Sequence, residues 1–142
     1  MQSTNLHLSA QFPESIQQWQ AMIESTAADV GLDPNLIAAV MLQESGGNPS
    51  AYSFSGAVGL MQVMPKDGIA SAFMCGAKPC FLNRPTTSEL LNPQFNIHYG
   101  SNYLAGLIHQ KGFEREALRA YGHMDVGFDY ADAVLAIFEN FR

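Results

Sequence analysis

The sequence places one carboxylate, Glu44, at the end of an apolar helix, where it could act as an acid–base catalyst. Asp33-Pro34 is a typical helix start, with Asp as the N-cap and Pro in the first turn. Two glycines and a proline in the run at 45–49 end the helix. At about 100° per residue, Glu44 falls in the same sector as Leu36 and Val40. The pattern therefore points this carboxylate toward the core or toward a cleft cut into it.

Two effects would raise the pKa of Glu44 in this position. Burial disfavours the ionised carboxylate, and the negative end of the helix dipole acts in the same direction. A carboxyl group with a raised pKa can serve as a general acid near neutral pH. In the alternative interpretation Glu44 bends out into solvent, and the helical pattern alone leaves both interpretations open.

A loop rich in Gly and Ser follows Glu44 and ends in an apolar turn that carries the amide of Gln62. Glycine lets the backbone approach a ligand closely, and Ser hydroxyls or the Gln amide could bind sugar hydroxyls or orient the carboxyl group. A plain surface loop would have the same composition. The candidates in this loop are Ser53, Ser55, Gly56, Gly59 and Gln62.

The order of these residues resembles the signature of soluble-type lytic transglycosylases, the SLT domain of the lysozyme-like superfamily (similar to glycoside hydrolase family 23). The first block is Glu44-Ser45, then Ser53-x-x-Gly56-Ala57-x-Gly59-Leu60-Met61-Gln62-x-Met64-Pro65. Later blocks follow in the family's order: Asn92-Pro93-x-x-Asn96-Ile97-x-x-Gly100-x-x-Tyr103-Leu104, Ala117-Leu118-x-Ala120-Tyr121, and Tyr130-Ala131-x-x-Val134-Leu135. The resemblance runs from Pro34 to Leu135, and the combination is specific although each block alone is weak.

The resemblance implies a reaction centred on Glu44. This residue would protonate the glycosidic oxygen between MurNAc and GlcNAc, and would then take the proton of the MurNAc C6 hydroxyl. That hydroxyl attacks C1 and gives a 1,6-anhydro product without consuming water, helped by the 2-acetamido group, which is an exception to the two-carboxylate rule. The implied substrate-binding residues are Ser53 and Ser55 near the acetamido group, Gln62 at a subsite, Met61 as an apolar floor, and Tyr121 and Tyr130 lining the site.

Three matched or aromatic positions have structural interpretations as well. Asn96 lies on the apolar face of the helix that begins at Asn92-Pro93, and a buried Asn must be hydrogen-bonded, so it either ties two elements together or lines the cleft. For Tyr121 the structural alternative is core packing with a satisfied hydroxyl. Trp19 is assigned to the core rather than to sugar binding.

The sequence departs from the family at two turns. The family continues Ala-Tyr with Asn and an Ala-Gly-Pro turn, whereas this chain has Tyr121-Gly122-His123-Met124-Asp125. After Met64-Pro65 the chain continues Lys66-Asp67-Gly68-Ile69, where the family often has Thr-Ala. These differences affect substrate contacts expected from the turns and leave the chemistry of Glu44 in place.

The whole chain has the size and composition of one folded domain. Its 142 residues are 47% hydrophobic and 14% charged, which excludes a disordered chain. We expect an N-terminal arm over 1–12 and a single catalytic domain over 13–142. No segment alternates with a period of two, so the predicted fold is all-α, lysozyme-like, with a cleft and little or no sheet.

The helical pattern predicts several elements. They are helices at 13–30 and 35–44, a short helix near 59–64, irregular structure with an insertion over 65–91, and helices starting at Asn92-Pro93, at 113–121 and at 128–141. The insertion could form a wall of the cleft. It contains Cys75 and Cys80, for which we expect a disulfide rather than two free thiols, because Gly76 and Pro79 permit a tight turn. Their spacing does not fit a zinc site. No metal and no cofactor is expected.

Charge argues against some partners. The net charge is −6 and there is no basic cluster, which excludes a typical nucleic-acid surface. No stretch is long and apolar enough to span a bilayer, and no secretory signal is visible. The expected partner is the glycan strand of peptidoglycan, reached in the bacterial envelope (periplasm) or outside the cell, with delivery by a secretion or phage assembly as one route and a monomeric state.

Three functions stay open at this point. The first is a lytic transglycosylase. The second is a hydrolysing muramidase similar to goose-type lysozyme, which needs a second carboxylate, and Asp67, Asp125 and Asp129 are the candidates. The third is a non-catalytic glycan-binding module, against which the core-facing acid argues. Fold alone does not separate them.

Overall fold

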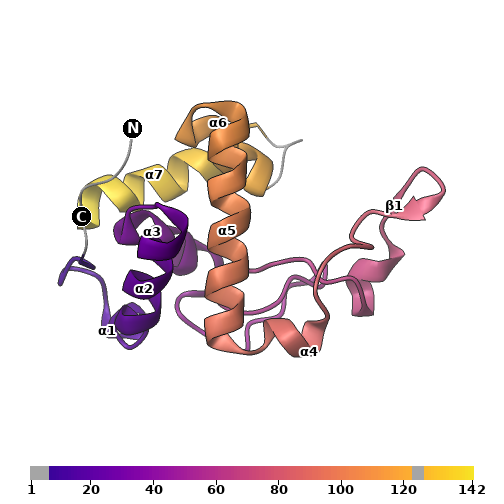
Figure 1. Ribbon diagram of the computed structural model, residues 1–142, viewed down its shortest axis with the longest axis horizontal. Helices are drawn as coiled ribbons and strands as arrows, with labels where there is room; N and C mark the ends of the chain where they lie inside the picture. Colours follow the sequence, from indigo (N-terminus) through magenta and orange to yellow (C-terminus); the bar gives the residue numbers. More distant parts are fainter. Residues whose placement is uncertain (1–6, 123–126) are drawn as a thin grey trace.

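The long helix α5 (Pro93–Lys111) is the axis of the fold, which a computed structural model describes for residues 7–122 and 127–142 (Figure 1). The other helices are α1 (Glu14–Gln17), α2 (Gln20–Val30), α3 (Pro34–Ser45), α4 (Thr87–Leu90), α6 (Glu114–Tyr121) and α7 (Asp129–Phe141), with a 3-10 helix η1 (Gly68–Ala72). Strands β1 (Met74–Cys75) and β2 (Lys78–Pro79) pair in a small antiparallel hairpin. The predicted all-α fold is confirmed.

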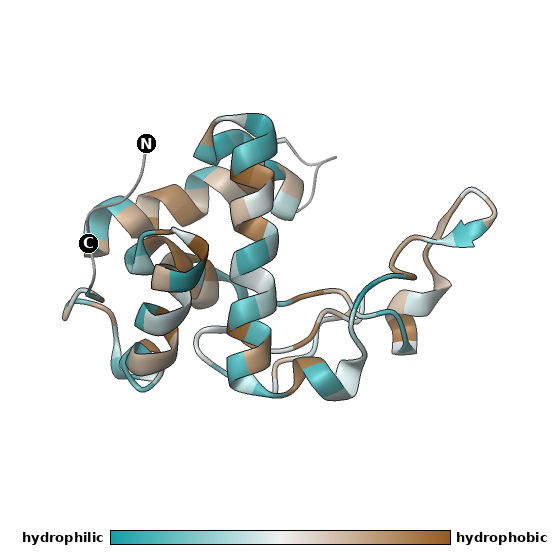
Figure 2. Ribbon diagram, in the orientation of Figure 1, coloured by the Kyte–Doolittle hydropathy of each residue, from teal (hydrophilic) through white to brown (hydrophobic). Residues whose placement is uncertain are grey.

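The core forms around α3, whose residues from Pro34 to Met41 are all buried. Helix α3 packs against α2 and α7, and α5 packs against α2 and α6. The middle of α7 is apolar whereas α6 is largely hydrophilic, so α6 covers the outside of the bundle (Figure 2). Because α3 is enclosed by its neighbours, the residue at its end is held in a fixed place.

Helix α5 begins and ends as the sequence predicts. The side chain of Asn92 accepts a hydrogen bond from the Phe95 amide at 3.0 Å, and Pro93 occupies the first turn. Gly112 ends the helix with a left-handed φ of 88°. Within the described residues, no helix combines the length and apolar character needed to cross a bilayer.

The N-terminal part differs in detail from the prediction. The single helix expected over 13–30 is divided into α1 and α2 by a turn at Gln18 and Trp19. Of the arm expected over 1–12, the structure describes residues 7–12, where Leu8 and Phe12 are buried in the core. Trp19 is partly buried against the core, as expected, and its Nε1 donates to the Gly47 carbonyl at 3.1 Å.

The helix predicted near 59–64 is wrong, because this segment forms turns joined by isolated bridges. Val58 bridges to both Tyr52 and Val63. Gly59 has a φ of 79° and Gln62 a φ of 52°, and left-handed residues cannot continue a right-handed helix. The apolar residues of this segment are buried nonetheless, so it forms the inner end of the Ser/Gly loop.

Residues 66–86 form a side lobe that extends away from the helical body (Figure 1). It contains η1 and the hairpin, and Cys75 and Cys80 form a disulfide with an S–S distance of 2.05 Å. The predicted disulfide is therefore present. Most of the lobe is exposed, and Arg84 fixes its base by donating to the Met64 carbonyl at 3.2 Å.

Candidate active site

Glu44 lies in the last turn of α3, directly before the segment that turns away at Gly46. The side chain of Ser45 donates to the Leu60 carbonyl at 2.7 Å, which ties the end of the helix to the Ser/Gly loop. Glu44 is half-buried, and this burial raises the pKa of its carboxyl group to about 7, against a smaller lowering effect of the Tyr130 hydroxyl. A carboxyl group that titrates there can both donate and accept a proton near neutral pH.

Tyr130 on α7 faces this carboxyl group. Its hydroxyl is buried and has no hydrogen bond of ordinary geometry to any described residue. Burial and the charge of Glu44 nevertheless raise the pKa of Tyr130, and its hydroxyl in turn lowers that of Glu44. Each of the two groups thus shifts the pKa of the other. We therefore interpret the pair as a close approach that a small side-chain rotation would turn into a hydrogen bond.

Tyr121, at the end of α6, is the second tyrosine near Glu44. Its hydroxyl donates to the Met61 carbonyl at 2.8 Å, and its ring lies 5.7 Å from that of Tyr103. Burial and the Glu44 charge raise the pKa of Tyr121. Tyr121 thus has the satisfied hydroxyl of the structural interpretation, and it also lines the pocket described below.

The loop residues predicted to bind substrate have different surroundings. The Ser53 hydroxyl accepts from the amides of Ser55 and Ala57 at 3.2 and 2.9 Å, so it shapes the loop. The side chain of Ser55 is exposed at the pocket. Gln62 also lines the pocket, and its Nε2 donates to the carbonyls of Ala51 and Gly59 at 3.1 and 3.0 Å.

Met61 and Asn96 lie in the core rather than on the cleft surface, since neither has an exposed side chain. Asn96 makes three hydrogen bonds: it donates to the Val58 and Leu90 carbonyls at 2.8 and 3.0 Å and accepts from the Met61 amide at 2.8 Å. The structural interpretation of Asn96 is the one that this geometry supports. Met61 packs on α5 where Gly100 leaves room, so the apolar floor predicted for it is not exposed to a ligand.

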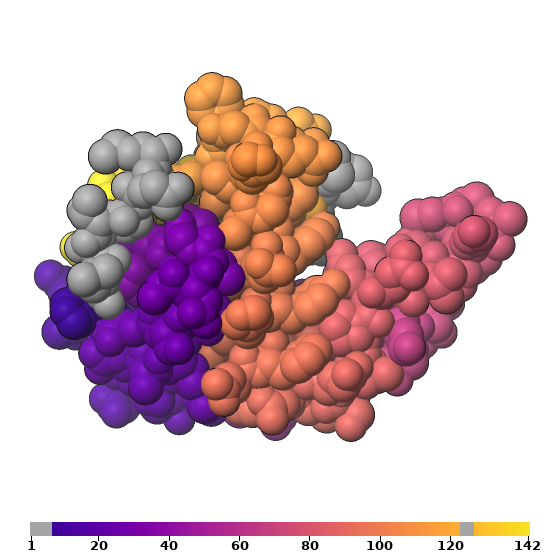
Figure 3. All heavy atoms as spheres, viewed as in Figure 1, coloured from indigo at the N-terminus to yellow at the C-terminus, as the bar shows by residue number. Residues whose placement is uncertain are grey.

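A pocket of about 320 Å³ lies between the Ser/Gly loop, the side lobe and α5. The space-filling view shows the same region as a hollow between the helical body and the lobe (Figure 3). Glu44 does not line this pocket. Tyr121 does line it, and the charge of Glu44 contributes to the raised pKa of Tyr121. The insertion predicted to wall the cleft therefore does so through Phe73, Cys80 and Phe81.

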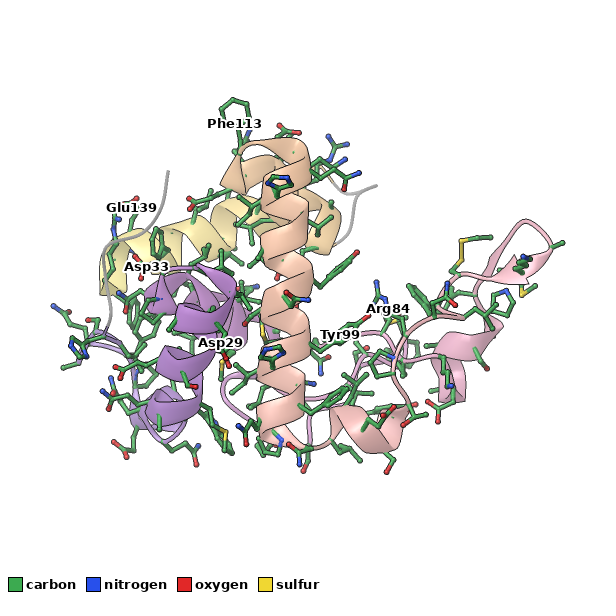
Figure 4. All side chains as sticks on the ribbon, viewed as in Figure 1. Asp29, Asp33, Arg84, Tyr99, Phe113 and Glu139 are labelled. Atoms are coloured by element: carbon green, nitrogen blue, oxygen red, sulfur yellow. A yellow bond between two sulfur atoms is a disulfide. The ribbon has the colours of Figure 1, made fainter. Side chains whose placement is uncertain are left out.

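Arg84 is a pocket residue that the sequence analysis missed. It lies between α5 and the side lobe (Figure 4), with its guanidinium 4.7 Å from the Tyr103 ring centre and 5.2 Å from that of Phe81. No repeat or motif around Arg84 singles it out. The only feature of the sequence that draws attention to Arg84 is the small number of Lys and Arg residues, seven in 142.

The second carboxylate required by a hydrolase is not found beside Glu44 in the part of the chain that the structure describes. Asp67, on the side lobe, accepts hydrogen bonds from the amide and hydroxyl of Thr87 at the start of α4, and Asp129 is exposed at the start of α7. Neither contributes to the pKa shift of Glu44. Asp125 lies outside the described residues. Over 7–122 and 127–142, no group of acids, His or Cys is arranged to hold a metal ion.

A known family model matches most of the chain, including the helix that carries Glu44 and the Ser/Gly loop. The model of the transglycosylase SLT domain matches residues 21–127. The chain belongs to this family. In SLT terms, the matched segment contains Glu44, the Ser/Gly loop, the side lobe, α5 and α6, and α7 with Tyr130 lies just beyond it.

Similar proteins and structures agree with this assignment. Over 88 residues the chain is 42% identical to the endo-type membrane-bound lytic murein transglycosylase A of Klebsiella pneumoniae (strain 342) and to that of Salmonella enteritidis. These matches cover 62% of this chain and 42% of each relative, so this chain spans about two-fifths of the length of those relatives.

Among solved structures, an inactive mutant of the lytic transglycosylase Slt of Pseudomonas aeruginosa superposes with a TM-score of 0.66 at 25% identity, covering 92% of this chain and 24% of that one. The 70 kDa soluble lytic transglycosylase of Escherichia coli also gives a TM-score of 0.66, at 21% identity, covering 86% of this chain and 24% of that one, which shows the fold alone. The lysozyme-like arrangement predicted from the resemblance is confirmed by these superpositions.

Proposed function

We propose that this chain is a peptidoglycan lytic transglycosylase domain that cleaves the MurNAc-β-1,4-GlcNAc bond without water. The observation that carries the proposal is Glu44, a half-buried carboxyl group with a pKa of about 7 at the position of the family's catalytic acid. Its described surroundings supply two tyrosines and no second acid. Such a site suits one group that acts as acid and then as base.

The proposed reaction begins with protonated Glu44. Its proton passes to the glycosidic oxygen as the bond from C1 to that oxygen breaks, and the GlcNAc end leaves as an alcohol. The Glu44 carboxylate then takes the proton of the MurNAc C6 hydroxyl while O6 bonds to C1. The proton therefore returns to Glu44, water is not consumed, and the product has a 1,6-anhydro end.

Supporting roles follow from the geometry. The Tyr130 hydroxyl, buried without a described partner, can stabilise the Glu44 carboxylate in the second half of the reaction. Ser55, Gln62 and Tyr121 offer polar groups to the sugar from the pocket wall. Ser53, Asn96 and Met61 contribute indirectly, because their hydrogen bonds shape the Ser/Gly loop and fix it against α5.

Mass spectrometry of the products from purified peptidoglycan tests the proposal, with Glu44→Gln as the control. Anhydro-muropeptides released by the parent and absent with Glu44→Gln are the expected result. Products heavier by one water would overturn the transglycosylase and support a muramidase, with Asp125 as the first acid to substitute. Binding without any product from the parent would support a glycan-binding module.

The site of action follows from the substrate. Peptidoglycan lies in the bacterial envelope, and the similar proteins of Klebsiella and Salmonella are membrane-bound lytic murein transglycosylases. We therefore propose that the domain acts in the envelope or outside the cell. The Cys75–Cys80 disulfide fits an oxidising compartment of this kind.

A further inference from the structure

A second groove crosses the long helix α5, away from the Glu44 site. It encloses about 650 Å³ over α5 and is bordered by α2 on one side and α4 on the other. Asp29 and Tyr99, which both line it, lie on opposite sides of α5 (Figure 4). This groove shares no lining residue with the pocket beside the Ser/Gly loop, so it is a separate feature.

An aromatic pair forms one wall of the groove. The rings of Phe95 and Tyr99 stack with centroids 6.3 Å apart and planes within 9° of parallel, and Phe95 is 38% exposed. Tyr103 follows four residues later on the same face of α5 and lines the catalytic pocket. Successive rings start about 6 Å apart along the helix axis. The three aromatic side chains therefore form a stripe that leads from the groove to the catalytic pocket.

Hydrogen-bonding groups without partners among the described residues also line the groove. Thr26 is only 4% exposed and lines the groove, yet its hydroxyl makes no hydrogen bond to any described residue. Ser25 and Asn102 line the groove too, and neither side chain has a hydrogen bond within 7–122 and 127–142. Because the Thr26 hydroxyl is not one of the fully buried unpaired groups, it is open to the groove, where a ligand hydroxyl or amide can bond to it.

The charge of the lining restricts the ligand. Asp29 and Glu89 border the groove, and among the described lining residues there is no Lys or Arg, with His98 as the only basic side chain. Phosphates, nucleic acids and acidic peptides would meet like charge there. A neutral sugar chain fits, because its rings have apolar faces for aromatic side chains and its hydroxyl and amide groups bond to Ser, Thr, Asn and Asp.

We propose that this groove binds the neutral sugar backbone of a β-1,4-linked N-acetylhexosamine chain, in line with the pocket beside the Ser/Gly loop. The choice of this sugar rests on the proposed function. Binding at both places by one strand would raise the local concentration of substrate at Glu44.

An NMR titration with chitotetraose, the β-1,4-linked tetramer of GlcNAc, tests the inference. In Glu44→Gln protein, the amides of Thr26, Phe95 and Tyr99 should shift on titration. Adding Phe95→Ala should weaken this response at least about tenfold, and Thr26→Val, which keeps the shape and removes the hydroxyl, should weaken it about threefold. Phe113→Ala removes a ring that is 72% exposed and lies outside both pockets, so it should leave the response unchanged.

The outcomes separate this inference from the proposed function. Shifts confined to the residues around Glu44, or groove shifts that survive both Phe95→Ala and Thr26→Val, would overturn the second site and leave the transglycosylase untouched. Groove shifts in a protein whose parent releases no anhydro-muropeptides would support the second site while the proposed function fails. The circular dichroism spectrum of each variant confirms that it is folded.

Discussion

Three elements converge on one carboxyl group at the residue scale. Helix α3 carries Glu44, α7 brings the Tyr130 hydroxyl and α6 brings Tyr121. Desolvation by this enclosure is the main reason why the pKa of Glu44 is raised, and the nearby tyrosine hydroxyl acts against it. The chemistry therefore depends on enclosure more than on any single polar contact.

The raised pKa of Glu44 predicts a pH-dependent effect of Glu44→Gln on stability. Because the carboxyl pKa rises from 4.5 to about 7 on folding, the parent loses stability as the pH rises through this window. At pH 8 the Gln variant should be the more stable by up to about 3 kcal/mol, and at pH 4 the two should be alike. Urea unfolding at both pH values measures this. Glu114→Gln, an exposed change of the same kind, is the control, and an equal difference at both pH values would contradict the prediction.

Tyr130→Phe should change the pH profile of the reaction while the fold is kept. The hydroxyl lowers the pKa of Glu44, so its loss should raise that pKa further and move the alkaline limb of kcat/KM to higher pH. The rate should fall about tenfold, because the carboxylate is less stabilised when it acts as base. Rates on soluble glycan across pH 5–9 measure both effects. An unchanged alkaline limb would show that the hydroxyl does not contact Glu44.

The sequence predicted the acid but not all of its neighbours. Helical spacing was enough to point Glu44 inward, since that depends only on local geometry. Whether Met61 and Asn96 lie in the core or on the cleft surface depends on packing between segments far apart in the chain, which the sequence alone does not show. Arg84 had no signal at all, because its position depends on how the side lobe folds back against α5.

At the element scale, α5 joins the core to the catalytic pocket. Its inner face holds Asn96, which is hydrogen-bonded to the Ser/Gly loop and to α4, and Gly100, which makes room for Met61 and Tyr121. Its outer face holds the stacked Phe95 and Tyr99. One helix therefore sets the positions of the Ser/Gly loop and of both grooves.

A matched pair of glycines on α5 tests this role. A Cβ at Gly100 would lie 2.7 Å from the Met61 sulfur and 3.1 Å from the Tyr121 hydroxyl, whereas one at Gly106 would meet nothing within 4 Å. Gly100→Ala should cost about 1–3 kcal/mol of unfolding free energy and lower activity. Gly106→Ala should stabilise the protein by about 0.5–1 kcal/mol with unchanged activity. Thermal unfolding and product release measure this, and equal effects of the two changes would count against tight packing at Gly100.

The prediction of secondary structure failed where the backbone adopts left-handed conformations. Proline, asparagine and glycine marked the ends of α5 correctly because each acts locally. The helix expected near 59–64 did not form, since Gln62 adopts a left-handed φ that its residue type does not announce. Its conformation is fixed by side-chain bonds to Ala51 and Gly59, which only the folded loop provides.

At the scale of the whole molecule, the side lobe and the helical body contribute differently. The body contains nearly all of the buried core, while the lobe is mostly exposed and forms one wall of the pocket beside the Ser/Gly loop. The disulfide lies in the lobe. Stability and pocket shape should therefore respond separately to its removal.

Replacing both Cys75 and Cys80 by Ser should lower the unfolding temperature by no more than about 7 °C, because so short a disulfide loop constrains the unfolded chain by only about 2 kcal/mol. Turnover should fall about three- to tenfold, since Cys80 and its neighbour Phe81 line the pocket. Differential scanning calorimetry and product release measure the two quantities. A large loss of thermal stability with unaltered turnover would contradict this division.

The acidic character of the chain predicts a salt effect. With a net charge of −6, it should be repelled by acidic stem peptides. Raising NaCl from about 20 to about 200 mM should screen this repulsion and increase kcat/KM on peptidoglycan about two- to threefold. Affinity for neutral chitotetraose should not change over the same range, and a parallel change would rule out charge as the cause.

The hydrogen bond from the Trp19 indole to the Gly47 carbonyl gives the molecule a built-in optical reporter. Trp19 is the only tryptophan, and its bond partner lies three residues beyond Glu44. Its emission therefore reports on the segment where the catalytic helix ends. Ligand-induced movement of that segment can be followed by intrinsic fluorescence without any label.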